Sequence, residues 1–161
     1  MEITMNTTLT RGEALHTVDF AIEQFINDIE IEDNMLEVIT YAVNNDVQIR
    51  DYFLGLPAQF DMQVCVDFVN YLSRLTNAEN CYAYDTISAM YHIEKGNNEL
   101  ASTLLDGAEI ANPDYNLTKL AQRVLSAGWP GEALATMRGK LHSQVVAIIE
   151  EEPDYVIGEV A

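Results

Sequence analysis

Apolar residues recur at helical intervals along most of the chain, and no proline interrupts a periodic segment. The pattern is clearest over residues 10–30, where Thr10 and Glu13 form the T-x-x-E capping box that begins many helices. The apolar residues that follow share one face of a helix: Leu15, Val18, Ile22, Phe25 and Ile29. We therefore expect an all-α fold that begins with a helix over residues 10–30, and we expect this apolar face to be buried.

Further periodic segments extend the prediction to a compact bundle of about seven or eight helices. These segments lie around residues 36–45, 49–53, 58–75, 82–94, 98–111, 116–127 and 130–150. The two ends of the chain have a different pattern, because their apolar residues alternate. This alternation, at Ile3, Met5, Thr7 and Leu9 and again at Val156, Gly158 and Val160, is typical of two short strands or of loose ends.

Length and composition predict a single domain over residues 1–161, since 161 residues of which 48% are hydrophobic suffice for one core. Within it we distinguish acidic helices at 10–80, repeat-like hairpins at 81–150 and an acidic tail at 151–161. The N-terminus is unlike a signal peptide, and no apolar run is long enough to span a membrane. Cys65 and Cys81 are too few for a disulfide framework. We expect a cytoplasmic protein with reduced thiols, with one disulfide as the alternative.

Residues 89–113 have the small-residue spacing of a tetratricopeptide repeat. The positions that carry it stand in order: Ala89, Gly96, Ala101, Leu105, Ala108 and Pro113. A glycine ends the first helix in a left-handed turn, and alanines let two helix axes approach closely. A weaker copy follows 32 residues later at Gly128, Ala133 and Met137. The spacing predicts tetratricopeptide-like hairpins in the C-terminal half; the alternative is that unrelated helical hairpins share small residues.

Over roughly residues 49–130 the chain carries a further pattern. It consists of Arg50-Asp51 before a short apolar run, Gly96-Asn97 at a helix end, an Ala-Leu-rich helix over residues 101–108, and a Pro-x-Tyr-x-Leu segment at Pro113, Tyr115 and Leu117. This pattern resembles an actinobacterial family known only as domain of unknown function 4192. Members of that family are usually longer at the N-terminus and less acidic there. The resemblance implies an all-α C-terminal module and an actinobacterial or bacteriophage setting, and it brings no catalytic residue.

The negative charge of the chain is large and uneven. There are 26 acidic residues and 8 Lys or Arg, a formal net charge of −18. Residues 1–49 contain ten acids and a single base, Arg11, whereas residues 115–149 carry Lys119, Arg123, Arg138 and Lys140 against Glu132. Such a molecule repels nucleic acid and anionic lipid and attracts basic partners. The alternative is that the charge serves only solubility.

Motifs for catalysis and metal binding are absent from the sequence. It contains no H-E-x-x-H, no Walker glycine loop and no G-x-S-x-G, and its three histidines, His16, His92 and His142, are far apart. The acidic run Glu150–Glu152 lacks the spacing of a calcium loop. We predict a protein that is not an enzyme and has no cofactor and no metal site. A hydrolase or nucleotide-handling enzyme would need a pocket, which the sequence does not locate.

The predicted partner-binding surface is the outer side of helix 10–30, where Phe20 lies opposite the apolar face among acidic residues. The alternative is that Phe20 forms a second core layer under helices 36–45 or 58–75. Trp129, between Gly128 and Gly131, is either a plug over a hairpin or an exposed anchor. The candidate partner-binding residues are Glu13, Asp19, Phe20, Glu23, Glu30 and Trp129.

These features together predict a non-enzymatic protein that binds a basic protein partner and binds neither nucleic acid nor membrane. In its most specific form, the prediction is an inhibitor encoded by a phage or mobile element that mimics DNA and occupies the nucleic-acid site of a host protein. The alternative is an assembly subunit that forms homo-oligomers. In these, the acidic residues 1–49 of one copy would dock on the basic segment 115–149 of the next copy.

Overall fold

The computed structural model describes residues 7–160, which fold as an all-α bundle with one small sheet. Each predicted helix is present. Within the described residues the helices are α1 (Arg11–Ile26), α2 (Asp33–Asn45), α3 (Val47–Gly55), α4 (Met62–Leu75), α5 (Tyr82–Lys95), α6 (Asn98–Ala111), α7 (Asn116–Ser126) and α8 (Gly131–Glu151). A short 3-10 helix, Leu56–Ala58, lies between α3 and α4. None of these helices is long and apolar enough to cross a membrane.

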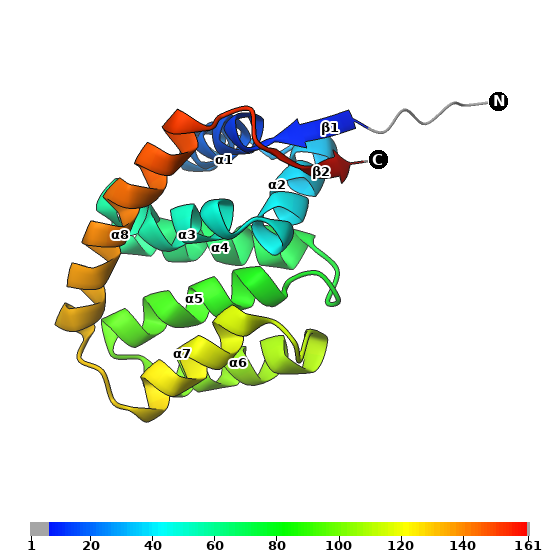
Figure 1. Ribbon diagram of the computed structural model, residues 1–161. Coiled ribbons are helices and arrows are strands. Elements are labelled where there is room, and N and C mark those ends of the chain that lie inside the picture. The colour runs from blue at the N-terminus through cyan, green and yellow to red at the C-terminus, as the bar shows by residue number, and fades with distance from the viewer. Residues whose placement is uncertain (1–6, 161) are drawn as a thin grey trace.

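The two ends of the described chain meet in a two-stranded antiparallel sheet (Figure 1). Strand β1 (Thr7–Thr10) pairs with β2 (Val156–Val160), and Thr7 lies opposite Val160. The predicted terminal strands are therefore confirmed for these residues, whereas Ile3 and Met5 lie outside the described part. Helix α8 runs along one side of the bundle, from the α7 end to the sheet (Figure 1). It is the element that links the C-terminal hairpin region back to α1.

Helix α1 begins as predicted but ends earlier. The Glu13 backbone N–H donates to Thr10 Oγ1 at 3.2 Å, so Thr10 caps the helix. The helix stops at Ile26, because Asn27 caps its C-terminus and Asp28 has a left-handed φ of 58°. The predicted apolar face is correct for Val18 and Ile22, which are fully buried, but Ile29 lies beyond the helix and is exposed. The prediction that Ile29 belongs to the buried face was wrong.

Two clusters of buried side chains hold the bundle together. The larger one, which we call the main core, draws on α1 to α5, the start of α7 and the second half of α8, and is rich in aromatic residues. The smaller one, the alanine core, lies between α5, α6, α7 and the start of α8 and contains Ala89, Ala101, Ala121 and Leu105. Helix α5 packs more extensively against α6 than any other pair of helices pack together. The predicted close hairpin is thus formed around small residues.

The turn of this hairpin needs glycine. Gly96 ends α5 with φ 84°, a left-handed conformation that L-residues with a side chain rarely adopt. After it, the chain reverses into α6, and Ala101, Leu105 and Ala108 of that helix are buried. The glycine and alanine positions of the first copy, Gly96, Ala101 and Ala108, therefore have the structural roles that we predicted for them.

The predicted weaker copy of the repeat at Gly128, Ala133 and Met137 does not form a second hairpin, because helix α8 does not fold back on α7. Helix α8 packs mainly against α3 and also on α5, and Met137 is exposed. The α3 contact depends on Gly55, because a Cβ atom there would lie 2.2 Å from His142 Nδ1 of α8. Two helices can approach this closely only where one of them lacks a side chain. Since α7 and α8 both pack on α5 but diverge from each other, a space remains between them.

The N-terminal end of α1 is fixed by a buried ion pair. Arg11 donates to both carboxylate oxygens of Asp46, at 2.7 and 3.1 Å, and Asp46 also accepts the Ile49 N–H at 3.0 Å. The Arg11 guanidinium lies 3.9 Å from the centre of the Tyr155 ring. Arg11 is therefore buried and neutralised, so the single base of residues 1–49 adds no positive charge to the surface.

Candidate functional site

Carboxylates dominate the surface formed by α1, α2 and the connection between them. Residues 12–49 contain no Lys or Arg. Their exposed acidic side chains, which we call the acidic surface, are Glu13, Glu23, Asp28, Glu30, Glu32, Asp33 and Glu37. None of the seven forms an ion pair with another described residue. This surface therefore carries a local negative charge that no neighbouring cation compensates.

Phe20 lies on the side of α1 that faces away from the main core. Its side chain is 53% exposed, whereas Val18 and Ile22 of the same helix are fully buried. Helical geometry places Glu23 one turn after Phe20 and Glu13 two turns before it, on the same side of the helix. The alternative of a second core layer over Phe20 is wrong, and Phe20 is an exposed aromatic among carboxylates.

Asp19 has a different environment from the one predicted. It is half-buried and accepts a short hydrogen bond from the Tyr52 hydroxyl of α3. Burial, followed by this hydrogen bond, raises the pKa of Tyr52. Because Asp19 is turned toward α3, it joins α1 to α3 and does not flank Phe20. Its main role is to satisfy a buried tyrosine.

The structure does not bring Trp129 to the acidic surface. Trp129 is 41% exposed and lies in the connection between α7 and α8, at the opposite end of the bundle from α1 (Figure 1). The ring is therefore partly open to solvent. Of the predicted residues, Glu13, Phe20 and Glu23 share one helix face, and Glu30 lies in the connection that follows. Trp129 belongs to a separate surface.

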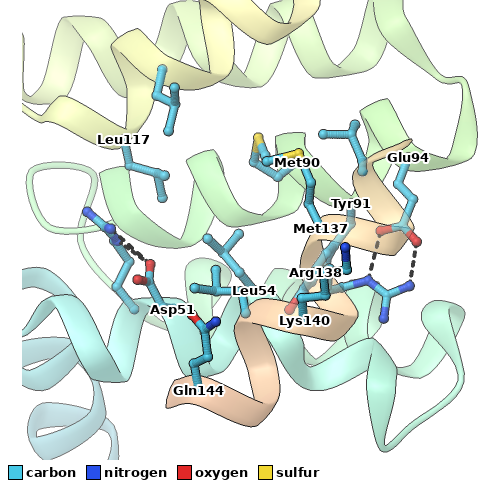
Figure 2. Close-up of a pocket in the computed structure, with 14 residues that line it drawn as sticks. Asp51, Leu54, Met90, Tyr91, Glu94, Leu117, Met137, Arg138, Lys140 and Gln144 are labelled. Carbon is cyan, nitrogen blue, oxygen red and sulfur yellow. Dashed lines mark hydrogen bonds and ion pairs between the residues drawn. The ribbon is translucent and has the colours of Figure 1, made fainter. Parts of the chain in front are cut away.

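A mostly apolar hollow, which sequence reasoning missed, lies between α3, α5, α7 and α8 (Figure 2). Its volume is about 450 Å³, and five leucines and two methionines line it. Its floor contains the buried side chains of Tyr91, Leu117 and Leu134. Its rim contains Leu120, Met137 and Leu141, which are 47%, 52% and 37% exposed. We call this hollow the α7–α8 groove.

Two ion pairs flank the groove. Arg138 of α8 donates to both carboxylate oxygens of Glu94, at 2.6 and 3.1 Å, and Arg50 donates to Asp51 Oδ1 at 2.9 and 3.0 Å (Figure 2). Since Arg138 is engaged in this way, three of the four bases of residues 115–149 have no ionic partner among the described residues: Lys119, Arg123 and Lys140. Lys140 is the one that lines the groove.

Several titratable groups of the described residues lie in the interior, and Ser73 donates a hydrogen bond to Asp85 Oδ1 at 2.8 Å. Burial raises the pKa of Cys65 to about 12 and also raises that of Cys81, so both thiols stay protonated at neutral pH. Burial lowers the pKa of His142, whose Nε2 lies 2.8 Å from Gln59 Nε2. Within residues 7–160 no three His, Cys, Asp or Glu side chains cluster as a metal site would require. The acidic surface and the α7–α8 groove are the two candidate binding features of the described residues.

Comparisons with known proteins add no further assignment. The resemblance over residues 49–130 to domain of unknown function 4192 stays a prediction, since no family model, no curated protein and no solved structure matches the chain.

Proposed function

We propose that this protein is not an enzyme and acts by binding a basic protein partner through its acidic surface, with Phe20 as the apolar anchor. The observation that carries the proposal is the 53% exposure of Phe20 on a helix face that it shares with Glu13 and Glu23. Aromatic residues are enriched among the side chains that dominate binding energy at protein interfaces. Unpaired carboxylates around such a ring accelerate the approach of a positively charged partner.

The most specific form of the proposal is a partner that itself binds nucleic acid. Duplex DNA presents one phosphate about every 1.7 Å along its axis, and no single helix can match that density. The seven carboxylates of the acidic surface come instead from two helices and their connection, which supports partial mimicry of a nucleic-acid backbone. The protein would then inhibit a host protein, as the product of a phage or mobile element could.

The test is a comparative capture experiment with two classes of variant. Tagged wild-type protein and Phe20→Ala are exposed to the same cell lysate, and retained proteins are quantified by mass spectrometry. We expect basic proteins that the wild type retains to be lost with Phe20→Ala and with the double variant Glu23→Lys/Glu30→Lys. Trp129→Ala, which removes an exposed aromatic from the other end of the molecule, is the matched control and should retain them. Equal retention by all variants would exclude the acidic surface as the binding site.

Self-association is a second candidate function, favoured by the position of the unpaired cations. Lys119, Arg123 and Lys140 lie on α7 and α8, remote from the acidic surface on α1 and α2 (Figure 1). A head-to-tail contact between these surfaces would generate rings or filaments. Sedimentation at low and high salt separates the two candidates. Assemblies that dissociate as salt screens the contact, and that Lys119→Glu/Arg123→Glu abolishes, would favour self-association; a monomer throughout would exclude it.

A further inference from the structure

The α7–α8 groove is separate from the acidic surface, and none of its lining residues belongs to that surface. We propose that it binds a small apolar carboxylate, with the alkyl chain in the groove and the carboxylate at Lys140 and Gln144. Ligand binding in the groove can be tested independently of the protein-binding function proposed above, because the two sites share no residue.

The apolar part of the groove is built to accept a flexible chain. Met90, Met137, Leu54 and Leu117 point into the same space from four different helices (Figure 2). Methionine side chains adapt to ligands of irregular shape because they are unbranched and polarizable. Met137 and Leu120 leave about half of their surface exposed at the rim, so an apolar occupant would remove apolar area from water. The shape and lining favour an aliphatic ligand.

The size of the groove favours a small molecule over a protein helix. A volume of about 450 Å³ lies within the roughly 300–1,000 Å³ typical of small-molecule sites. The paired charges Arg50–Asp51 and Arg138–Glu94 flank the apolar part (Figure 2). These pairs limit the length of apolar surface that a docking helix could cover.

The charge of the lining selects the headgroup. Arg50 and Arg138 are each compensated by a carboxylate, at 2.9 and 2.6 Å, which leaves Lys140 as the uncompensated charge among the lining residues. Gln144 lies one helical turn further along α8 and also lines the groove, and neither side chain donates a hydrogen bond to another described residue. An ammonium and an amide on the same helix face both donate to a carboxylate. The lining thus complements one negative charge at the end of an apolar chain.

The proposal is tested by calorimetric titration of the full chain with decanoate and with decanol, which has the same chain length and no charge. We expect saturable binding of decanoate with one site per chain and weaker binding of decanol. Lys140→Gln should weaken decanoate binding roughly two- to fivefold, the range for an exposed ion pair, and leave decanol binding unchanged. Lys119→Gln removes a lysine of α7 that does not line the groove, and it is the matched control with no expected effect.

The variant Met137→Glu tests whether the ligand binds in the α7–α8 groove. Because Met137 is 52% exposed, the substitution should leave the folded structure intact, which circular dichroism checks, and it should weaken binding of both ligands at least tenfold. Absence of saturable decanoate binding, or binding that Met137→Glu does not change, would overturn the proposal. Two further outcomes would also overturn it: tight binding of a designed Leu/Glu amphipathic helix with no decanoate binding, and a dimer that Met137→Glu dissociates. These would assign the groove to a helical peptide or to a second copy of the chain.

Discussion

The main core and the alanine core are packed with side chains of opposite size. In the main core, the ring of Phe53 stacks on Phe68 with centroids 6.2 Å apart, and Tyr84 meets Phe53 edge-on at 6.1 Å. In the alanine core, Ala89 and Ala101 are fully buried between α5 and α6, and Leu105 fills the space beside them. Large aromatic rings keep helix axes apart and fill the space between them, whereas alanines allow helix axes to lie close together. The two regions should therefore tolerate opposite kinds of substitution.

The two candidate binding sites follow this division. The acidic surface lies outside the main core, on α1 and α2, and Phe20 is not needed to fill the interior beneath it. The α7–α8 groove opens beside the alanine core, since Leu134 and Met90 take part in both. Each site can therefore be changed without disturbing the other.

Truncation in the main core should cause the greatest loss of stability. Phe53 is fully buried and contacts two other aromatic rings, so Phe53→Ala should lower the free energy of unfolding by about 3–5 kcal/mol. Urea denaturation at neutral pH measures this difference. Phe53→Leu, which keeps most of the volume, should cost less. A loss below about 1 kcal/mol for Phe53→Ala would contradict the view that aromatic volume stabilises this core.

Enlargement in the alanine core should be the damaging change there. Ala101 has no exposed surface, and Ala101→Leu should lower the free energy of unfolding by roughly 1–3 kcal/mol through overpacking between α5 and α6. Ser102→Leu adds a similar side chain at the next, exposed position of α6, and its effect should stay within about 0.5 kcal/mol. If both variants unfold at the same denaturant concentration, the close approach of the two helices is not what this core depends on.

A smaller effect on the free energy of unfolding should depend on pH, because His142 is buried where α8 packs against the main core. Burial, followed by Arg138, lowers the pKa of His142 from 6.5, against an opposing effect of Asp19. The folded state keeps this imidazole neutral, whereas the unfolded chain takes up a proton below the ordinary pKa. Above pH 6.5, His142 is neutral in both states and does not reduce the free energy of unfolding. The free energy of unfolding then falls as the pH drops from 6.5 through the lowered pKa of His142 in the folded state.

Unfolding midpoints measured between neutral and mildly acidic pH test this linkage. They should decline below the ordinary histidine pKa, and His142→Asn should reduce the slope of that decline. His16→Asn, at an exposed histidine of α1, is the control variant. The slope is informative even if His142→Asn lowers stability at every pH, because a purely structural loss would shift the curve without flattening it.

The smallest effect on stability is expected at Phe20. Phe20→Ala should change the free energy of unfolding by no more than about 0.5 kcal/mol, because the ring lies mostly in solvent. Phe25→Ala in the same helix is the matched comparison, since that ring packs 5.6 Å from Phe68 and 5.2 Å from Tyr71 and its loss should destabilise the fold clearly. A large loss for Phe20→Ala would show that α1 needs this ring for folding, and the proposed anchor would lose its basis.

Local sequence signals were sufficient for the secondary structure. Every α-helix that the described residues form was predicted from the spacing of apolar residues, the Thr10 cap, the left-handed Gly96 and the prolines outside the periodic segments. These signals suffice because each acts within a few turns of backbone. The alternation at the two ends fitted either strands or loose ends, and the structure shows strands. Helix boundaries were predicted less well. Periodicity continues to Ile29, past the helix end at Asn27, where the backbone turns. The helix predicted from residue 58 begins only at Met62, after the 3-10 helix Leu56–Ala58.

The sequence by itself thus determined an all-α chain with an acidic first half and a close-packed hairpin around small residues. Only the tertiary structure decided which side chains the helices cover. Phe20 and Phe25 are aromatic residues of one helix, and the packing of α4 against α1 partly covers only the second. Asp19 and Glu23 are both acids of that helix, and only the first meets a buried tyrosine. The α7–α8 groove exists because α8 packs on α3 and diverges from α7, a long-range arrangement that no local periodicity encodes.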